Sequence, residues 1–240
     1  MGSTDPDDQL TERHADRVRR VFGDAELAAR YGRDRFPKSR HVREARTLAK
    51  LLPSLDPGPT LDLACGAGRF GADLAGRGDG VVGADASAAM LHEARRTGDY
   101  SLLVCADARR LPFGGRAFAG AICIRLLQHL DADDRRSVLS ELRRVSSGPV
   151  IVSFFDAATF EAVRARLRRR SAQQRSRRAV SVSEIERDFT ATGWRLSKLE
   201  RKLGRLTEHV FALIVPVLVS GPGDGRPDAP TDGLRGSGAG

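Results

Sequence analysis

The chain has few cysteines and aromatic residues, and it lacks a long hydrophobic run. Its three cysteines, Cys65, Cys105 and Cys123, form no CxxC pair, which excludes a disulfide-stapled miniprotein and disfavours a structural zinc site. Each lies in or beside an apolar run, so we expect reduced, buried thiols and no metal site. The longest apolar run near the C-terminus, residues 210–219, contains Pro216 and falls short of the roughly 20 residues that cross a bilayer.

The N-terminus is acidic and has no apolar core, which predicts that it is no signal peptide and that the protein is soluble and cytoplasmic. Residues 1–8 and 220–240 are predicted to be disordered, because 10 of the last 21 residues are Gly or Pro. The remaining length suits one good-sized domain, and 40% hydrophobic residues exclude a wholly disordered chain.

Lysine is scarce, and the basic charge is concentrated in one segment. Arginines are 36 of the 40 basic residues, and residues 155–180 carry eight of them against Asp156 and Glu161, so +6 of the net charge of +9 lies there. We favour the interpretation that the run 164–178 is a solvated helix face. The functional alternative is that this run attracts an anionic substrate. RNA binding is disfavoured but kept as an alternative, because no aromatic residue lies between Glu161 and Asp188 to stack on bases.

From Thr60 onward, short apolar runs alternate with helical stretches. The runs are apolar on both faces, which is typical of strands in a covered parallel sheet. Two further runs, 194–200 and 208–216, are separated by only about seven residues and must pair antiparallel, because a parallel crossover needs a dozen or more. The sequence therefore predicts an α/β, Rossmann-like open sheet of seven strands, five parallel plus a C-terminal antiparallel hairpin, with helices on both faces.

Residues 9–56 are predicted to be helical and to form an N-terminal lid, with a stabilising flap as the alternative. Residues 57–219 form the main domain, and 155–182 are predicted to be an Arg-rich helical insertion within it. Ser183 and Glu186 fit a capping box, which predicts a helix that starts there and ends at Gly193.

The first strand ends in the sequence LDLACGAG, which has the character of a ligand-binding turn. Gly66 and Gly68 allow a tight turn and let a ligand approach the backbone, and the next helix directs N–H groups toward an anion. Asp62 precedes these glycines at the strand end, where its burial would be costly without a hydrogen-bond donor.

Two more acids are predicted at strand ends. Asp85 follows Gly66 by 19 residues at the end of the second strand, where a carboxylate can accept both hydroxyls of a ribose. Asp107 follows the third strand, where it can accept a hydrogen bond from an exocyclic amine. Carboxyl ends of parallel strands meet at one edge of the sheet, so these residues predict a nucleoside site.

Residues 66–71 also satisfy GxGxxG, which makes an NAD(P)-dependent oxidoreductase the competing hypothesis. Three features count against it: the acid before the glycines, the second acid Asp107, and the antiparallel hairpin in place of a second mononucleotide-binding half.

The motifs LDLACGAG, GADASAAML, Asp107 to LPF, and AICIRLLQHL followed by ELRRV resemble, in this order, those of class I S-adenosylmethionine-dependent methyltransferases. The resemblance covers about residues 58–156 by motif and 180–216 by topology. It implies methyl transfer from S-adenosylmethionine to nitrogen or oxygen of a small acceptor, with anionic acceptors among the candidates. Ala64 departs from the family, which usually has Gly there.

The resemblance also implies roles for individual residues. The loop from Asp62 to Gly68 would hold the methionine and ribose part of the cofactor, and Asp85 would take the ribose hydroxyls. The predicted cofactor-binding residues are Asp62, Ala64, Cys65, Gly66, Gly68, Asp85, Ala86, Met90, Ala106, Asp107, Ala108 and Ile124. Of these, Ala86 and Met90 would flank adenine, Asp107 with Ala108 would read its amine, and Ile124 would wall the site near the methyl group.

The acceptor side is predicted just beyond the fourth strand. His129 is the candidate catalytic base, although a histidine that orders the loop is the favoured interpretation. Arg125 is a candidate to bind a substrate anion or, equally, to pair with an acid. Tyr31 and Arg40 of the N-terminal segment are further candidate substrate contacts. The other histidines are expected to be surface or half-buried residues: His14, His41, His92 and His209.

Overall fold

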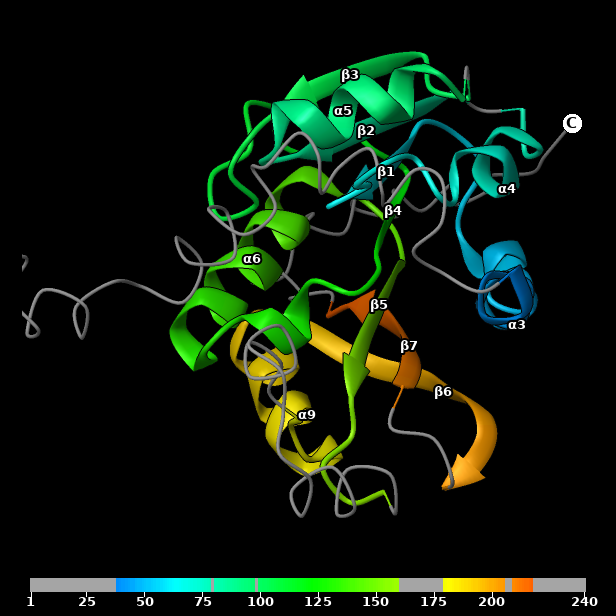
Figure 1. Ribbon diagram of the computed structural model, residues 1–240. Helices are drawn as coiled ribbons and strands as arrows, with labels where there is room; N and C mark the ends of the chain where they lie inside the picture. The colour runs from blue at the N-terminus through cyan, green and yellow to red at the C-terminus, as the bar shows by residue number, and fades with distance from the viewer. Residues whose placement is uncertain (1–37, 79, 98, 160–178, 206–208, 218–240) are drawn as a thin grey trace, which may run out of the picture.

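Seven strands form one mixed sheet in the order β3-β2-β1-β4-β5-β7-β6 in a computed structural model of the protein (Figure 1). The structure describes residues 38–217 except 79, 98, 160–178 and 206–208, and only the backbone of 38–40 and 202–205. The strands are β1 (Thr60–Leu63), β2 (Val81–Asp85), β3 (Leu102–Cys105), β4 (Gly120–Cys123), β5 (Val150–Phe155), β6 (Trp194–Arg205) and β7 (His209–Pro216). The predicted tails, residues 9–37 of the predicted lid and most of the Arg-rich insertion lie outside the described residues.

The pairing of the strands confirms the predicted fold. Strands β1 to β5 are parallel, and β7 pairs antiparallel with β5 on one side and with β6 on the other. The first hairpin strand is longer than predicted, because β6 continues to Arg205 after a register shift between Leu196 and Lys198. The chain order changes direction between β1 and β4, which is where open α/β sheets bind ligands.

The helices are α3 (Lys38–Ala49), η2 (Leu52–Ser54), α4 (Gly71–Ala75), α5 (Ala88–Arg95), η3 (Leu127–His129), α6 (Ala132–Val145) and α9 (Val182–Ala191). The predicted capping box is wrong by two residues: the Ser181 hydroxyl, not that of Ser183, accepts the hydrogen bond from the N–H of Glu184. Both serines have an acid three residues later, so the spacing alone could not choose between them. Gly193 follows the helix with a positive φ of 77°.

Each face of the sheet carries its own apolar layer, so helices lie on both faces as predicted (Figure 1). Alternate strand residues such as Ala121 and Val152 pack with Leu139 of α6 and Phe189 of α9. The residues between them face the opposite layer, which contains Leu48 of α3 and Leu74 of α4 in addition to Ile122 and Ile151 of the sheet. By the same alternation Asp62 and Ser153 belong to the α3 face of the sheet.

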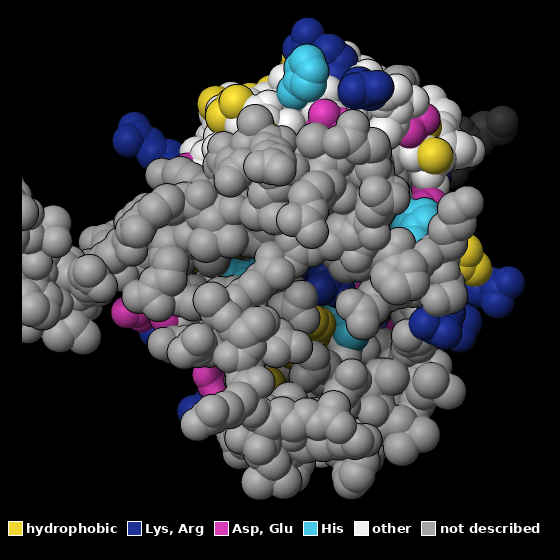
Figure 2. Space-filling model, in the orientation of Figure 1, with side chains coloured by type: hydrophobic (Ala, Val, Ile, Leu, Met, Phe, Trp, Pro, Cys, Tyr) yellow, Lys and Arg dark blue, Asp and Glu magenta, His cyan; other side chains and the backbone are white. Residues whose placement is uncertain are grey.

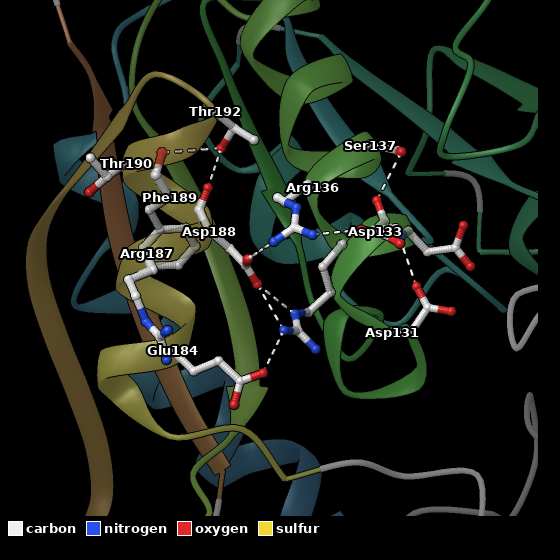
Figure 3. Close-up of polar contacts among 12 residues, drawn as sticks. Asp131, Asp133, Arg136, Ser137, Glu184, Arg187, Asp188, Phe189, Thr190 and Thr192 are labelled. Atoms are coloured by element: carbon white, nitrogen blue, oxygen red, sulfur yellow. Dashed lines mark hydrogen bonds and ion pairs between the residues drawn. The ribbon is translucent and has the colours of Figure 1, made fainter.

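A buried ion-pair network fixes α9 to α6 (Figure 3). The Asp188 carboxylate is 3% exposed and accepts hydrogen bonds from Arg135 at 2.9 Å and Arg136 at 3.3 Å. Arg135 also pairs with Glu184 at 2.9 Å. Just beyond α9, the indole N–H of Trp194 donates to the carbonyl oxygen of Leu139 at 2.9 Å. The start of the antiparallel hairpin is thereby fixed against α6.

The cysteines agree with the prediction in two of three cases. Cys65 and Cys123 are buried, and burial raises the pKa of both thiols above their usual range. Cys105 is exposed, contrary to the prediction, because β3 is an edge strand of the sheet. In the described part of the chain, no helix is long and apolar enough to cross a membrane, and no group of three His, Cys, Asp or Glu side chains could hold a metal ion.

Candidate functional site

The turn that follows β1 has three residues in the left-handed region: Ala64 at φ 59°, Gly66 at 56° and Gly68 at 78°. A Cβ added at Gly68 would lie 3.1 Å from both Ala94 and Tyr100, so this glycine is needed for close packing. A Cβ at Gly66 would meet nothing within 4 Å, so this glycine borders open space. The helix that follows has only five residues, and we therefore assign no anion site to its N-terminus.

Asp85, at the end of β2, faces this turn. Its two oxygens accept hydrogen bonds from the N–H groups of Gly66 and Ser87, each at 2.9 Å. A carboxylate offers about four acceptor positions, so the backbone donors, which also include the N–H of Ala86, do not exhaust its capacity. Burial raises the pKa of the carboxyl group, although the N–H donors oppose that shift. The geometry places a partly satisfied carboxylate beside the open space at Gly66.

Asp62 is 2% exposed, and the Tyr100 hydroxyl donates a hydrogen bond to its carboxylate at 2.7 Å. The acid therefore has the donor that its burial requires, but the sequence did not identify Tyr100 as that donor. Burial raises the pKa of Asp62 to about 7; the Tyr100 hydrogen bond lowers it, and the negative charge of Asp85 raises it further. Two neighbouring carboxylates thus occupy the ends of β1 and β2.

The raised pKa of Asp62 predicts that stability falls as pH rises. In the unfolded chain the carboxyl group ionises near its ordinary pKa of 3.8, whereas in the folded state it keeps the proton until about pH 7. The unfolding free energy should therefore decrease between about pH 4 and 7, by up to about 4 kcal/mol for a shift of this size. Urea unfolding at pH 5 and pH 8 measures the larger part of this decrease.

In Asp62→Asn this contribution to the pH dependence should disappear, because an amide does not titrate. Tyr100→Phe should move the midpoint above that of the wild type, because the donor that favours the ionised form is lost. Equal pH dependence in the wild type and Asp62→Asn would contradict the assignment.

Asp107 lies two residues beyond β3, and its carboxylate is held by Arg109. The backbone N–H and the guanidinium of Arg109 donate to it at 2.8 to 3.2 Å, and the same guanidinium reaches Asp134 of α6 at 3.1 Å. The Asp107 side chain remains 31% exposed. A ligand amine at this position would share the carboxylate with Arg109, a competitor that the sequence did not reveal.

The structure brings the other predicted cofactor-binding residues to the same edge of the sheet. Leu63 is in register with Ala84, and Asp85 with Cys105, so the ends of β1, β2 and β3 are adjacent. Buried residues there are Cys65, Met90 and Ile124, and partly or fully exposed ones are Ala64, Ala86, Ala106 and Ala108.

Arg125 follows Ile124 at the end of β4 and has a left-handed φ of 69°. Its N–H donates to the Ser153 hydroxyl at 2.8 Å, and its carbonyl oxygen accepts a hydrogen bond from the side chain of Gln128. Its guanidinium pairs with Glu44 at 3.2 Å and lies 5.6 Å from the ring centroid of Phe155. Of the two predicted roles for Arg125, the structure therefore shows the pairing with an acid.

His129 lies buried in η3, where its backbone N–H donates to the carbonyl oxygen of Leu126. Its role as a base stays a prediction. Tyr31 and the side chain of Arg40 lie outside the described residues, so their predicted substrate contacts also stay predictions.

A buried polar cluster that the sequence did not indicate surrounds Glu44 of α3. The Glu44 cluster consists of Glu44, Arg69, Arg125, Ser153 and His209. Glu44 accepts hydrogen bonds from both arginines and lies 3.1 Å from Nδ1 of His209, while Nε2 of His209 lies 2.9 Å from the Ser153 hydroxyl. His209 is buried, and the prediction of a surface or half-buried position is therefore wrong, because β7 places this residue on the covered α3 face of the sheet.

The hydrogen bonds of the Glu44 cluster assign the protons of His209. Burial lowers the pKa of His209, which favours the neutral ring. The Glu44 carboxylate can only accept, so Nδ1 carries the proton and Nε2 accepts from the Ser153 hydroxyl. Ser153, His209 and Glu44 thus follow the order of a hydrolase triad, but Ser153 is 0% exposed and cannot act as a nucleophile toward a substrate.

Comparison with known proteins identifies a domain family in this part of the chain. A methyltransferase domain family matches residues 60–147, which contain the glycine turn, Asp85, Asp107 and Arg125. The chain carries a class I S-adenosylmethionine-dependent methyltransferase domain. No protein of curated function matches the sequence.

Solved methyltransferase structures share the fold of the domain. The magnesium protoporphyrin IX methyltransferase of Synechocystis, with bound S-adenosylhomocysteine, superposes with a TM-score of 0.67 at 17% identity and covers 85% of this chain and 99% of its own. An S-adenosylmethionine-dependent methyltransferase from Clostridium acetobutylicum gives 0.61 at 16% identity, covering 80% and 97%. A protein from Pyrococcus horikoshii gives 0.61 at 25% identity, covering 75% and 90%.

The residues of the methyltransferase site fit the cofactor. The space at Gly66 that an added Cβ would enter is open, and the adjacent Asp85 carboxylate retains acceptor capacity. The two acids at the ends of β1 and β2 suit a ligand that has uncharged hydroxyl donors and a nearby positive charge. The competing nicotinamide hypothesis is not supported, since the sheet ends in the antiparallel pair β7-β6 instead of a second mononucleotide-binding half.

Proposed function

We propose that this methyltransferase transfers a methyl group from S-adenosylmethionine to a nitrogen or oxygen atom of a small acceptor at the ends of β4 and β5. The observation that supports it most strongly is Asp85, whose carboxylate spans Gly66 and Ser87 beside open space. S-adenosylmethionine supplies a methyl group on a sulfonium, which needs no further activation by the protein. The residues of the chain then have two tasks, which are to hold the adenosyl group and to align the acceptor.

The cofactor would be held by the ends of the first three strands. Asp85 would accept the ribose hydroxyls with its remaining acceptor capacity, and Asp62 would pair with the methionine ammonium. Ala86 and Met90 would flank the adenine, and Asp107 would accept a hydrogen bond from its amine. Ile124, just after β4, would line the site next to the methyl group.

The acceptor would enter next to Arg125, where β4 and β5 end. Transfer is an in-line displacement, so correct alignment of the acceptor atom alone can contribute several kcal/mol, up to roughly 7–11. An acceptor with a neutral amine or an ionised hydroxyl needs little help with its proton. His129 would serve acceptors that need a base.

Thermal denaturation in parallel with S-adenosylmethionine, S-adenosylhomocysteine, NAD and NADP tests the cofactor. We expect the first two to raise the melting temperature in proportion to the logarithm of their concentration and the nicotinamides to leave it unchanged. Release of S-adenosylhomocysteine in the presence of small amines and phenols then measures turnover. Stabilisation by NAD without stabilisation by S-adenosylmethionine would overturn the proposal.

A further inference from the structure

Two arginines converge where β1 and β4 end. Arg69 follows the glycine turn after β1, and Arg125 follows β4; these strands are hydrogen-bonded neighbours, with Leu63 in register with Cys123. This is the point where the strand order changes direction, so a ligand bound there touches both loops. Arg69 thus follows the proposed cofactor loop, and Arg125 lies on the proposed acceptor side.

Both arginines hold a single carboxylate. One oxygen of Glu44 pairs with Arg69, and the other pairs with Arg125 at 3.2 Å and with His209 at 3.1 Å. Burial by itself would raise the pKa of Glu44, but His209 and the two arginines hold it well below its usual range. Three donors from three separate parts of the chain therefore form a carboxylate-binding site, and a side chain of α3 occupies it.

Helix α3, which carries the occupant Glu44, is anchored by apolar contacts. Leu48, one turn after Glu44, anchors α3 in the apolar layer with Leu51 and Phe70. A glutamate side chain rotates about three bonds, so it can exchange one partner for another while the backbone stays in place. In such an exchange Glu44 would give up the two arginines and keep His209 as its partner.

The arginines, in contrast, are fixed and reach the solvent. The backbone of Arg125 is left-handed and strained, and hydrogen bonds with Ser153 and Gln128 hold it on both sides. Such strain is common where a functional side chain must be held in a fixed orientation. The Arg69 and Arg125 side chains are 18% and 15% exposed, against 5% for Glu44. In Figure 2, Lys or Arg side chains and His side chains are visible near the centre of the view.

We propose that the methyl acceptor carries a carboxylate, which binds Arg69 and Arg125 in exchange for Glu44. This inference rests on the proposed function and names its substrate class. Glu44 then neutralises the arginines while no acceptor is bound, and the exchange orients the acceptor by a charge-assisted contact to both loops. Glu44 is a positioning residue in this scheme, and the arginines contact the substrate.

The test titrates acetate, the smallest probe of this chemistry, into the S-adenosylhomocysteine complex at constant ionic strength, with binding followed by NMR. Inorganic phosphate is titrated in parallel, because a phosphorylated acceptor would use the same arginines. We expect the wild type to bind acetate weakly, Arg125→Gln to lose binding, and Glu44→Gln to bind about tenfold more tightly, because the internal competitor is uncharged. Glu186→Gln, an exposed acid on α9, is the control and should match the wild type.

The outcomes are decisive in each direction. If Glu44 only stabilises α3, the wild type will not bind acetate, or Arg125→Gln will bind it as tightly as the wild type does. Either result overturns the proposal. Stronger binding of phosphate than of acetate would also overturn it and assign a phosphorylated acceptor. If Glu44→Gln does not fold, the comparison of the wild type with Arg125→Gln still decides. Affinity for S-adenosylhomocysteine is measured separately, and its absence in the wild type would contradict the proposed function instead.

Discussion

Asp85→Asn is expected to weaken the binding of S-adenosylhomocysteine by about 100-fold or more, because two charge-assisted hydrogen bonds to ribose hydroxyls contribute roughly 1.5–3 kcal/mol each. Isothermal titration calorimetry measures the loss. The substitution also places an amide N–H₂ near one of the N–H groups of Gly66 and Ser87, so the glycine turn itself will be disturbed. Affinity alone would therefore not separate a lost ligand contact from a loosened turn.

The 2′-deoxyribose analogue of S-adenosylhomocysteine makes this separation. The wild type should bind the analogue more weakly than the parent compound, whereas Asp85→Asn should bind both equally, because the partner of the missing hydroxyl is gone. Glu186→Gln removes an exposed charge on α9 and should retain the discrimination of the wild type. Discrimination that persists in Asp85→Asn would place the ribose elsewhere.

The parts of the fold that could be predicted are those that local patterns determine. Apolar runs on both sheet faces indicated the parallel strands, and the short connection before β7 required an antiparallel pair, as observed. The position of Asp85 opposite Gly66 also followed, because neighbouring parallel strands end at one edge. The helix start at Ser181 was missed, since two overlapping capping patterns fit the same sequence.

Contacts between distant residues could not be predicted in this way. Tyr100 reaches Asp62 across 38 positions of sequence, and His209 reaches Glu44 across 165. No spacing rule connects such pairs, because their approach depends on how helices lie on the sheet. One signal was present: Glu44 lies four residues before Leu48, and therefore on the buried side of α3, where an acid needs partners.

Ala64 stands where the family usually has glycine, and its backbone has a left-handed conformation. Its φ of 59° explains why glycine is usual at this position, since left-handed backbone costs an L-residue roughly 1–2 kcal/mol. The chain nevertheless folds through this strained alanine in the present structure. A second alanine in the same conformation should therefore also be compatible with the fold.

The second large effect that we expect is a loss of cofactor affinity in Gly66→Ala. It can be measured because the fold accepts an alanine in this conformation. The residue has a φ of 56°, and an added Cβ would meet no protein atom within 4 Å. The methyl group would instead enter the space assigned to the cofactor. We expect affinity for S-adenosylhomocysteine to fall by about 10- to 100-fold, the equivalent of an overpacking cost of roughly 1–3 kcal/mol, while the protein still folds.

Two other glycines supply the controls for Gly66→Ala. Gly78 also has a positive φ, 82°, and open space around it, but it lies beyond α4, so Gly78→Ala should lose similar stability and bind S-adenosylhomocysteine normally. Gly68→Ala should be less stable than either variant, because its Cβ would press on the backbone of Ala94 at 3.1 Å. Urea unfolding and calorimetry on the three variants separate backbone strain, packing and ligand exclusion. Normal binding by Gly66→Ala would show that the adenosyl group does not occupy the space at this turn, and the cofactor site would then have to lie elsewhere along the sheet edge.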